Sequence, residues 1–253
     1  MRFFYFSIMK NINDFLDATY LKTPEQANLS KLENDAVVEA LLQNAVKHTY
    51  KCVMIRPEHV ATAKQYLVKN KSKVLVGTVI DFPEGITALE EKLSQAQQAI
   101  DDGADDLDFV IDYQAFKNGD LALVQNQVKE CTQLGLQQHK TVKWIIETAA
   151  LSNKEIIQIT ALIKNVVIKN FKETDYANVF VKSSTGFYKT ENNQPNGATP
   201  NAITLMIENA TPLSVKASGG IKTLEEVLFY LQMGVKRIGT SAQNEILAQH
   251  KQL

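Results

Sequence analysis

Eight short apolar runs, each rich in Val, Ile or Phe, alternate along the chain with segments of helical spacing. Such runs are typical of strands buried on both faces, and single amphipathic segments between them are typical of crossover helices. The alternation therefore predicts a parallel β/α protein in which one helix follows each strand. The runs lie at residues 14–17, 50–55, 73–80, 106–111, 141–147, 178–184, 213–218 and 235–240.

Start signals mark several of the helices between these runs. Thr-Pro pairs at 23–24 and 199–200 place a capping hydroxyl before a proline in the first helical turn. Other segments carry a hydroxyl and a carboxylate three residues apart, which is the pattern of a capping box. These pairs are Thr87 with Glu90, Ser152 with Glu155, and Thr223 with Glu226.

Eight β/α units in about 240 residues match the (β/α)8 TIM barrel, whose typical size is about 250 residues. An open doubly wound sheet is the alternative, but no glycine-rich nucleotide-binding loop follows any predicted strand. No linker, internal repeat or low-complexity stretch interrupts the pattern. We therefore predict an α/β fold with one barrel domain at 12–253, preceded by an N-terminal extension at 1–11 in which Met9 is a more natural start.

The composition excludes several classes of function. The 27 Lys and Arg residues against 28 Asp and Glu give a net charge of −1, which does not favour nucleic acid or an anionic membrane. The two cysteines and four histidines lack the spacing of a zinc site or a disulfide framework. The opening MRFFYFSIMK is too short to span a bilayer and lacks a cleavage site. We therefore expect a cytoplasmic protein with no metal, nucleic-acid or membrane partner.

Two lysines close neighbouring predicted strands. Lys182 follows a Val-Phe-Val run, and Lys216 ends the next strand. A single strand-end lysine commonly extends into solvent, but two at the same height would repel each other. An amine nucleophile needs its pKa to fall from about 10.4 toward about 7 to 8. A fall of this size corresponds to a free energy of roughly 4 kcal/mol, which is what repulsion by a like charge about 4 Å away supplies. The pair therefore predicts a Schiff-base lysine whose neighbour supplies most of the activation.

Carboxylates accompany these lysines. Asp108 lies inside the apolar run 106–111, where a structural ion pair is the simpler interpretation, but beside two lysines it also fits proton transfer with a substrate hydroxyl. Asp17 ends the first run and either orients Lys216 as an ion-pair partner or caps a loop. Asp112 is a weaker candidate, because it starts a turn.

Glycines follow the sixth, seventh and eighth predicted strands: Gly186, Gly219, Gly220 and Gly239, the last shortly before Ser241. Backbone N–H groups at such loops approach anions closely, and barrels commonly bind phosphate after strands seven and eight. Simple turn glycines are the alternative, but two such loops on consecutive strands favour a phosphate site.

Seven motifs bring these residues together: FLDAT (15–19), GADDLDFV (103–110), IIET (145–148), VKSSTGF (181–187), GAT (197–199), VKASGGI (215–221) and RIGTS (237–241). In this order they resemble the deoxyribose-phosphate aldolase family, and the resemblance covers nearly the whole chain from about Asp14. It implies a class I aldolase that reversibly cleaves 2-deoxy-D-ribose 5-phosphate into D-glyceraldehyde 3-phosphate and acetaldehyde, in deoxyribonucleoside catabolism and without a cofactor.

The resemblance also implies a role for each site residue. Lys182 would be the Schiff-base nucleophile, Lys216 the second lysine, Asp108 the acid/base group and Asp17 the carboxylate that orients Lys216. The phosphate would be held by Gly186, Gly219, Gly220, Gly239 and Ser241. A homodimer is a family-level expectation.

Three features depart from the family pattern. Asp81 stands where a glycine is usual, Ala242 replaces a common serine, and the loop 188–196 is longer than usual. They bear on substrate preference more than on reaction type. Two other functions stay open: a Schiff-base aldolase for another phosphorylated sugar, and a non-catalytic phosphosugar-binding barrel.

Overall fold

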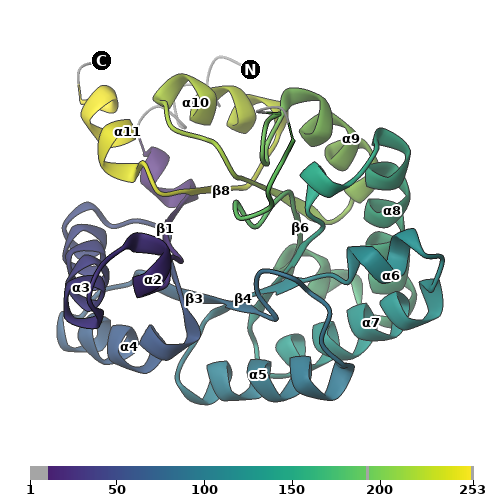
Figure 1. The fold of residues 1–253 in the computed structure, drawn as a ribbon, viewed down its shortest axis with the longest axis horizontal. Helices are drawn as coiled ribbons and strands as arrows, with labels where there is room; N and C mark the ends of the chain where they lie inside the picture. The colour runs from purple at the N-terminus through teal and green to yellow at the C-terminus, as the bar shows by residue number, and fades with distance from the viewer. Residues whose placement is uncertain (1–10, 192–193, 252–253) are drawn as a thin grey trace.

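A computed structural model of the chain describes residues 11–191 and 194–251. Within them, eight parallel strands close into a barrel in sequence order, with β1 paired to β8 (Figure 1). The predicted (β/α)8 barrel is confirmed, while residues 1–10 of the predicted extension lie outside the described residues. The strands are β1 (Leu16–Tyr20), β2 (Cys52–Ile55), β3 (Leu75–Ile80), β4 (Asp106–Val110), β5 (Thr141–Ile145), β6 (Val179–Lys182), β7 (Ser214–Ser218) and β8 (Arg237–Thr240).

Helices surround the strands as an outer ring (Figure 1). They are α2 (Pro24–Ala27), α3 (Lys31–His48), α4 (Val60–Lys69), α5 (Leu89–Asp101), α6 (Tyr113–Lys117), α7 (Leu121–Gln137), α8 (Asn153–Asn170), α9 (Pro200–Ala210), α10 (Leu224–Met233) and α11 (Gln243–His250), with short 3-10 turns η1 (Ile12–Phe15), η2 (Pro57–His59), η3 (Thr148–Ala150) and η4 (Glu173–Asn178). In the described part of the chain, none of them has both the length and the apolar character that a membrane span requires.

Strand side chains alternate between two different cores. In β2, Val53 and Ile55 pack in the large apolar core between strands and helices, whereas Cys52 and Met54 point to the barrel interior. Both sets are buried, which is why the strands show continuous apolar runs rather than an apolar–polar alternation. Any charged residue at an interior position is therefore enclosed by the barrel.

Most of the predicted helix starts are confirmed. Ser152 and Thr223 make the capping boxes of α8 and α10, and Thr23 and Thr199 cap the two helices that begin with proline. The capping box predicted at Thr87 is wrong: α5 begins after Ala88, and the Thr87 N–H donates to the Asp81 carboxylate at 2.9 Å.

The first strand lies further along the chain than predicted. Residues 14–17 were expected to form it, but Asp14 and Phe15 belong to η1, and β1 runs from Leu16. Asp17 is therefore the second residue of β1, paired in register with Cys52 at the start of β2, rather than the residue that closes the strand. Its side chain lies deep in the barrel and cannot cap a loop at the mouth.

Candidate active site

Seven charged side chains fill the barrel interior beside β4 to β8 and β1. All are buried, Lys182 being 3% exposed and Arg237 5%, and the other five wholly enclosed. On the opposite side, Cys52, Met54 and Val79 of β2 and β3 form a small apolar cluster with Leu21. The seven are Asp17, Asp106, Asp108, Lys143, Lys182, Lys216 and Arg237.

The two predicted lysines meet at one carboxylate. Lys182 and Lys216 are register partners on β6 and β7, so they lie at the same height. Their Nζ atoms lie 2.9 Å and 2.8 Å from Oδ2 of Asp108, which reaches them from β4 across the interior. The structure thus brings together the three residues that the sequence singled out from separate strands.

Asp17 holds the other side of Lys216. Its Oδ2 lies 2.6 Å from the Lys216 ammonium, while Oδ1 accepts a hydrogen bond from Arg237 Nε at 2.7 Å. The structure therefore confirms that Asp17 forms an ion pair with Lys216 and does not cap a loop. Burial alone would raise the pKa of Asp17, but Arg237, Lys216 and Lys143 lower it to about 2.

Sequence reasoning missed three members of this network. Lys143 of β5 donates to Asp106 at 2.8 Å and to Asp108 at 2.7 Å, and Arg237 bridges Asp17 and Asp106 at 2.6 Å each. A signal was present, since Lys143 stands in the middle of an apolar run, as Lys182 does at the end of one. Its interior orientation follows only from the strand register, which places Lys143 beside Asp108.

The pKa of Lys182 falls to about 8. Burial is the largest cause, because the enclosed amine loses the hydration that favours its charged form. Asp108 opposes the fall, and Lys216 and Lys143 add to it. The prediction that Lys216 supplies most of the activation is therefore wrong in its ranking: the enclosure contributes more than the neighbouring charge.

The pKa of Asp108 lies well below its usual range. Burial would raise it, but Lys143, Lys182 and Lys216 together outweigh that effect. Asp108 is consequently ionised, and its two oxygens accept hydrogen bonds from all three lysines.

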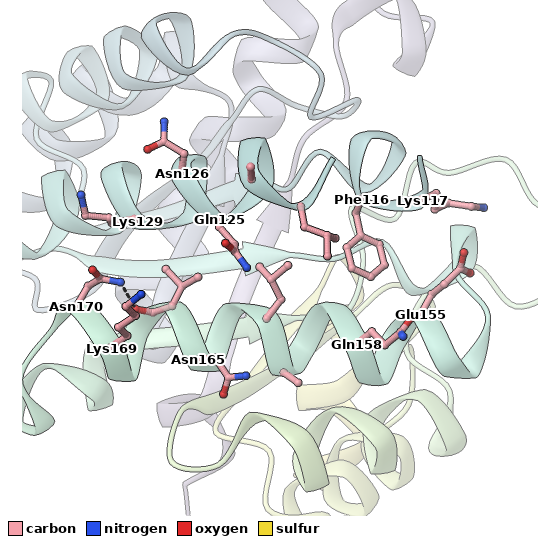
Figure 2. A pocket seen from close by; sticks show the side chains of 15 residues that line it. Phe116, Lys117, Gln125, Asn126, Lys129, Glu155, Gln158, Asn165, Lys169 and Asn170 are labelled. Atoms are coloured by element: carbon pink, nitrogen blue, oxygen red, sulfur yellow. Dashed lines mark hydrogen bonds between the residues drawn. The ribbon is translucent and has the colours of Figure 1, made fainter. Parts of the chain in front are cut away.

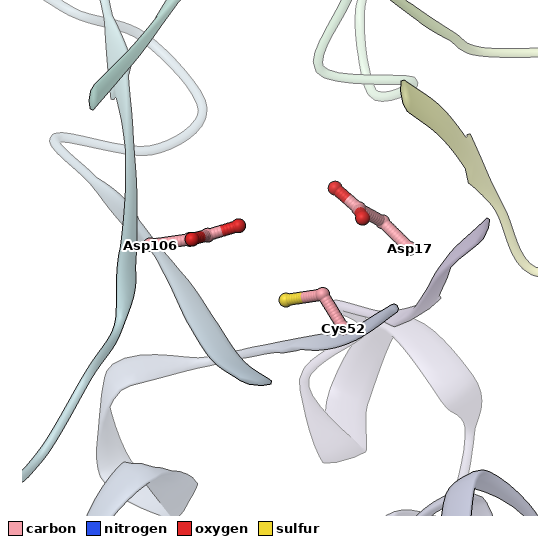
Figure 3. A group of neighbouring side chains, drawn as sticks. All are labelled: Asp17, Cys52 and Asp106. Atoms are coloured by element: carbon pink, nitrogen blue, oxygen red, sulfur yellow. The ribbon is translucent and has the colours of Figure 1, made fainter. Parts of the chain in front are cut away.

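Asp17, Cys52 and Asp106 point toward one another inside the barrel, with donor atoms close enough to surround a metal ion (Figure 3). However, Arg237 already bridges the two carboxylates, and Lys143 pairs with Asp106. The network of seven has four cationic and three anionic side chains, so adding a divalent cation would increase an existing excess of positive charge. Burial also raises the pKa of the Cys52 thiol well above its usual value, which disfavours the thiolate that binds metals. The donor set therefore does not suit a metal.

A cavity of about 500 Å³ opens above Lys182 at the carboxyl ends of the strands. All five residues predicted to bind phosphate line it: Gly186, Gly219, Gly220, Gly239 and Ser241. Lys182 lines it too, whereas Asp108, Lys216 and Asp17 are enclosed beneath. Two exposed lysines, Lys22 and Lys222, also line this cavity and add positive charge to it.

The lining glycines differ in what they contribute. The Gly186 N–H donates to Ser184 Oγ at 2.9 Å, so this group is already occupied. Gly239 leaves room for Lys216, whose Cε would lie 3.2 Å from a Cβ at that position. Gly220 has a left-handed φ of 81° and open space around it, which suits an approaching anion.

Two other carboxylates discussed above have structural partners. Asp81 adopts a left-handed φ of 53°, a conformation that favours glycine. Its carboxylate pairs with the buried Lys92, which also donates to the backbone oxygens of Gly85 and Val110. Asp112 caps α6 by accepting from the Ala115 N–H at 2.7 Å. Neither adds a free charge to the cavity.

A larger groove of about 810 Å³ lies outside the barrel between α7 and α8 (Figure 2). Amide and lysine side chains such as Gln125, Asn165 and Lys129 line it. It contains none of the predicted site residues and is open to solvent, so size alone does not identify the site.

A family model described as the DeoC/LacD family aldolase matches residues 16–242, nearly the whole barrel. The deoxyribose-phosphate aldolase of Thermococcus gammatolerans is 35% identical over 219 residues, which cover 86% of this chain and 90% of that relative.

Solved structures agree. The aldolase QR15 is 29% identical, with a TM-score of 0.78 over 96% of this chain and 98% of its own. The tetrameric deoxyribose phosphate aldolase of Aeropyrum pernix is 24% identical, with a TM-score of 0.77 over 99% of this chain and 97% of its own, a likeness that shows the fold.

Proposed function

The chain belongs to the DeoC/LacD family of aldolases and is thus a lyase, and from that membership we propose that it reversibly cleaves 2-deoxy-D-ribose 5-phosphate into D-glyceraldehyde 3-phosphate and acetaldehyde. The observation that carries the proposal is Lys182, a buried amine with a pKa of about 8 at the floor of the glycine-lined cavity. About a tenth of such amines are neutral at pH 7, enough to supply a nucleophile.

The charge count of the network supports Lys182 as the nucleophile. Four cations face three carboxylates, so one positive charge is in excess. Lys143 and Lys216 each contact two carboxylates, and Arg237 bridges two, whereas Lys182 contacts Asp108 alone. Deprotonation of Lys182 therefore makes the network electrically neutral and removes fewer ion pairs than deprotonation of any other member would.

The proposed reaction begins when the neutral Lys182 amine attacks the C1 aldehyde of the open-chain sugar to give a carbinolamine. The carbinolamine takes up one proton and loses water to give a protonated imine, and the same proton is released when the final imine is hydrolysed. The C3 hydroxyl then loses its proton, the C2–C3 bond breaks, and the bonding electrons move into the imine to form an enamine. Glyceraldehyde 3-phosphate departs. Protonation of the enamine at its terminal carbon, followed by hydrolysis, releases acetaldehyde and restores the amine.

Proton transfer in this scheme involves Asp108 and Lys216. Because Asp108 is enclosed beneath the cavity and does not line it, we assign it to a relay through water rather than to direct abstraction. Lys216 shares Oδ2 of Asp108 with Lys182, so a proton moves between the three groups over short distances. Asp17 fixes the far side of Lys216.

The substrate phosphate would lie against Gly219, Gly220 and the turn at Ser241, opposite Lys182 in the same cavity. Lys22 and Lys222 at the cavity lining would contribute attraction for the dianion. Gly186 and Gly239 would shape the site as described above. A phosphosugar fits these surroundings better than an uncharged sugar does.

We place the enzyme in the cytoplasm, where its two buried free cysteines would remain reduced. The homodimer remains a prediction, which light scattering of the purified protein would test.

The test of the proposed function is covalent trapping. Incubation with acetaldehyde and then borohydride should add one ethyl group to the peptide that contains Lys182, and a Lys182→Met variant should gain nothing. Cleavage of deoxyribose 5-phosphate should persist in EDTA. Modification of another lysine, or loss of activity in EDTA, would contradict the proposal. A panel of phosphorylated sugars separates this substrate from others, and retained cellular function in the Lys182→Met variant would favour a non-catalytic barrel.

A further inference from the structure

The end of β5 is tied to the loop that follows Lys182 by a buried glutamate that the proposed chemistry does not use. Glu147 is 1% exposed. Its Oε1 accepts from the Ser184 hydroxyl at 2.7 Å, and its Oε2 accepts from the Thr185 N–H at 3.2 Å and from the Thr185 hydroxyl. These are the second and third residues after Lys182.

The Glu147 carboxylate is held by these hydrogen bonds without a cation beside it. Among residues 11–191 and 194–251, no ammonium or guanidinium lies within ion-pair distance of its carboxylate. A buried carboxylate is costly unless donors satisfy it, and here the donors all come from one short loop. The negative charge is therefore committed to holding that loop.

The two hydroxyls transmit the effect to the cavity wall. Each hydroxyl donates a hydrogen bond to Glu147, so its lone pairs are left to accept from the backbone. Ser184 Oγ accepts from the Gly186 N–H at 2.9 Å, and Thr185 Oγ1 accepts from the Phe187 N–H at 3.0 Å. The carboxylate thus fixes the turn 184–187, which lines the cavity.

The next residue extends the connection to the β7 loop. The Thr148 N–H donates to Ser183 O at 2.8 Å, and its hydroxyl donates to Gly197 O at 3.0 Å. Gly197 packs directly behind Gly219, since a Cβ on Gly197 would lie 2.6 Å from the Gly219 Cα. The Ala198 N–H also donates to Gly219 O at 3.1 Å. Contacts therefore run from β5 to both loops of the proposed phosphate site.

The backbone of Glu147 is consistent with this use. Its φ of 55° is left-handed, a conformation that side chains other than glycine seldom adopt. Such strain persists where the surrounding contacts require the side chain, and it concentrates at functional sites.

We propose that Glu147 is a positioning residue for phosphate recognition, which holds the turn 184–187 and, with Thr148, sets the distance between the β6 and β7 loops. The inference rests on the proposed function, because it needs a phosphorylated substrate. It predicts that Glu147 affects phosphate binding more than chemistry at Lys182.

The test is Glu147→Gln, which keeps the size but leaves one acceptor oxygen for three donors, so at least one hydroxyl must turn away. KM for deoxyribose 5-phosphate should rise about tenfold or more, while kcat falls less than about threefold. Competitive inhibition by inorganic phosphate should weaken by a similar factor. Cleavage of unphosphorylated 2-deoxyribose, and borohydride trapping of acetaldehyde on Lys182, should stay within about twofold.

Two further variants make the test specific. Glu155→Gln makes the same change in the capping box at the start of α8, and it should alter neither substrate's kinetics. Thr148→Val removes only the hydroxyl bonded to Gly197 O, and it should raise KM for the phosphorylated substrate by a smaller factor, which also tests the idea if Glu147→Gln does not fold.

The inference would be overturned if Glu147→Gln lost kcat/KM equally for deoxyribose 5-phosphate and for unphosphorylated 2-deoxyribose, or lost it for neither. Unchanged kinetics in Thr148→Val would overturn its extension to the β7 loop and, if Glu147→Gln does not fold, the inference as a whole. If the unaltered enzyme fails to trap acetaldehyde at Lys182, the proposed function fails, and the inference falls with it. Trapping of acetaldehyde on the unaltered enzyme is therefore measured before any variant is compared.

Discussion

Replacing Lys182 by methionine should stabilise the folded protein while abolishing activity. The pKa of Lys182 falls from 10.5 to about 8 on folding, mainly because of burial. A fall of this size corresponds to a cost of about 3 kcal/mol for keeping the charged amine in the folded state. The side chain is 3% exposed, so solvent does not screen this cost away. Methionine fills a similar volume and leaves three cations facing three carboxylates.

The sign of the pH dependence follows from the direction of the shift. The folded pKa lies below the unfolded one, so the penalty is complete below about pH 8 and disappears as pH rises through about 10.5. The free energy of unfolding of Lys182→Met should therefore exceed that of the unaltered protein by about 3 kcal/mol at pH 7 and by less than about 1 kcal/mol at pH 10. For a chain of this size the gain at pH 7 corresponds to roughly 6–12 °C in the thermal midpoint.

Thermal and urea unfolding at the two pH values provide the measurement. The matched control is Lys216→Met, one strand away, where the lysine pairs with both Asp17 and Asp108. That variant should lose stability at pH 7, because it leaves buried carboxylate oxygens without their partner. A Lys182→Met variant that is no more stable than the unaltered protein at pH 7, or whose gain does not shrink at pH 10, would refute the reasoning.

Three other predictions follow from the same network and its surroundings. The kcat/KM for deoxyribose 5-phosphate should rise with pH to a plateau above about 8, because the free enzyme must hold Lys182 neutral, and a pH–rate profile that is flat from 6 to 9 would contradict this. Lys143→Met should raise the pKa of Asp108 and destabilise the fold by about 3–5 kcal/mol, measurable by urea unfolding, and a neutral effect would show that the ion pairs contribute nothing. The thiols of Cys52 and Cys131, both buried and with raised pKa, should resist iodoacetamide at pH 8 in the folded enzyme, as intact-mass spectrometry would report, whereas rapid alkylation would indicate an open barrel.

The periodic features of the sequence predicted the barrel and the lysine pair well. Apolar runs and capping residues are local signals, and Lys182 and Lys216 could be compared because each closes a recognisable run. The first strand was misplaced because its apolar pattern merges with the 3-10 turn before it. That error put Asp17 at the mouth instead of in the interior.

The rest of the charged network depends on information that no local pattern contains. Arg237 begins β8 and Asp106 begins β4, so neither stands at the carboxyl end of its strand, where the site of a barrel is expected. Their contact crosses the barrel and follows from strand order and register. The dominance of burial in the pKa of Lys182 likewise depends on how completely the other strands enclose it.

The Asp81–Lys92 pair makes the effect of a substitution at one of these positions depend on the residue at the other. With glycine at position 81, a lysine at 92 could still donate to the carbonyl oxygens of Gly85 and Val110. An aspartate at 81 without that lysine would combine a left-handed backbone with a buried anion held by the Thr87 N–H. The aspartate at 81 therefore depends on the lysine more than the lysine depends on the aspartate. Lys92→Met alone should consequently lower the free energy of unfolding more than Lys92→Met combined with Asp81→Gly does.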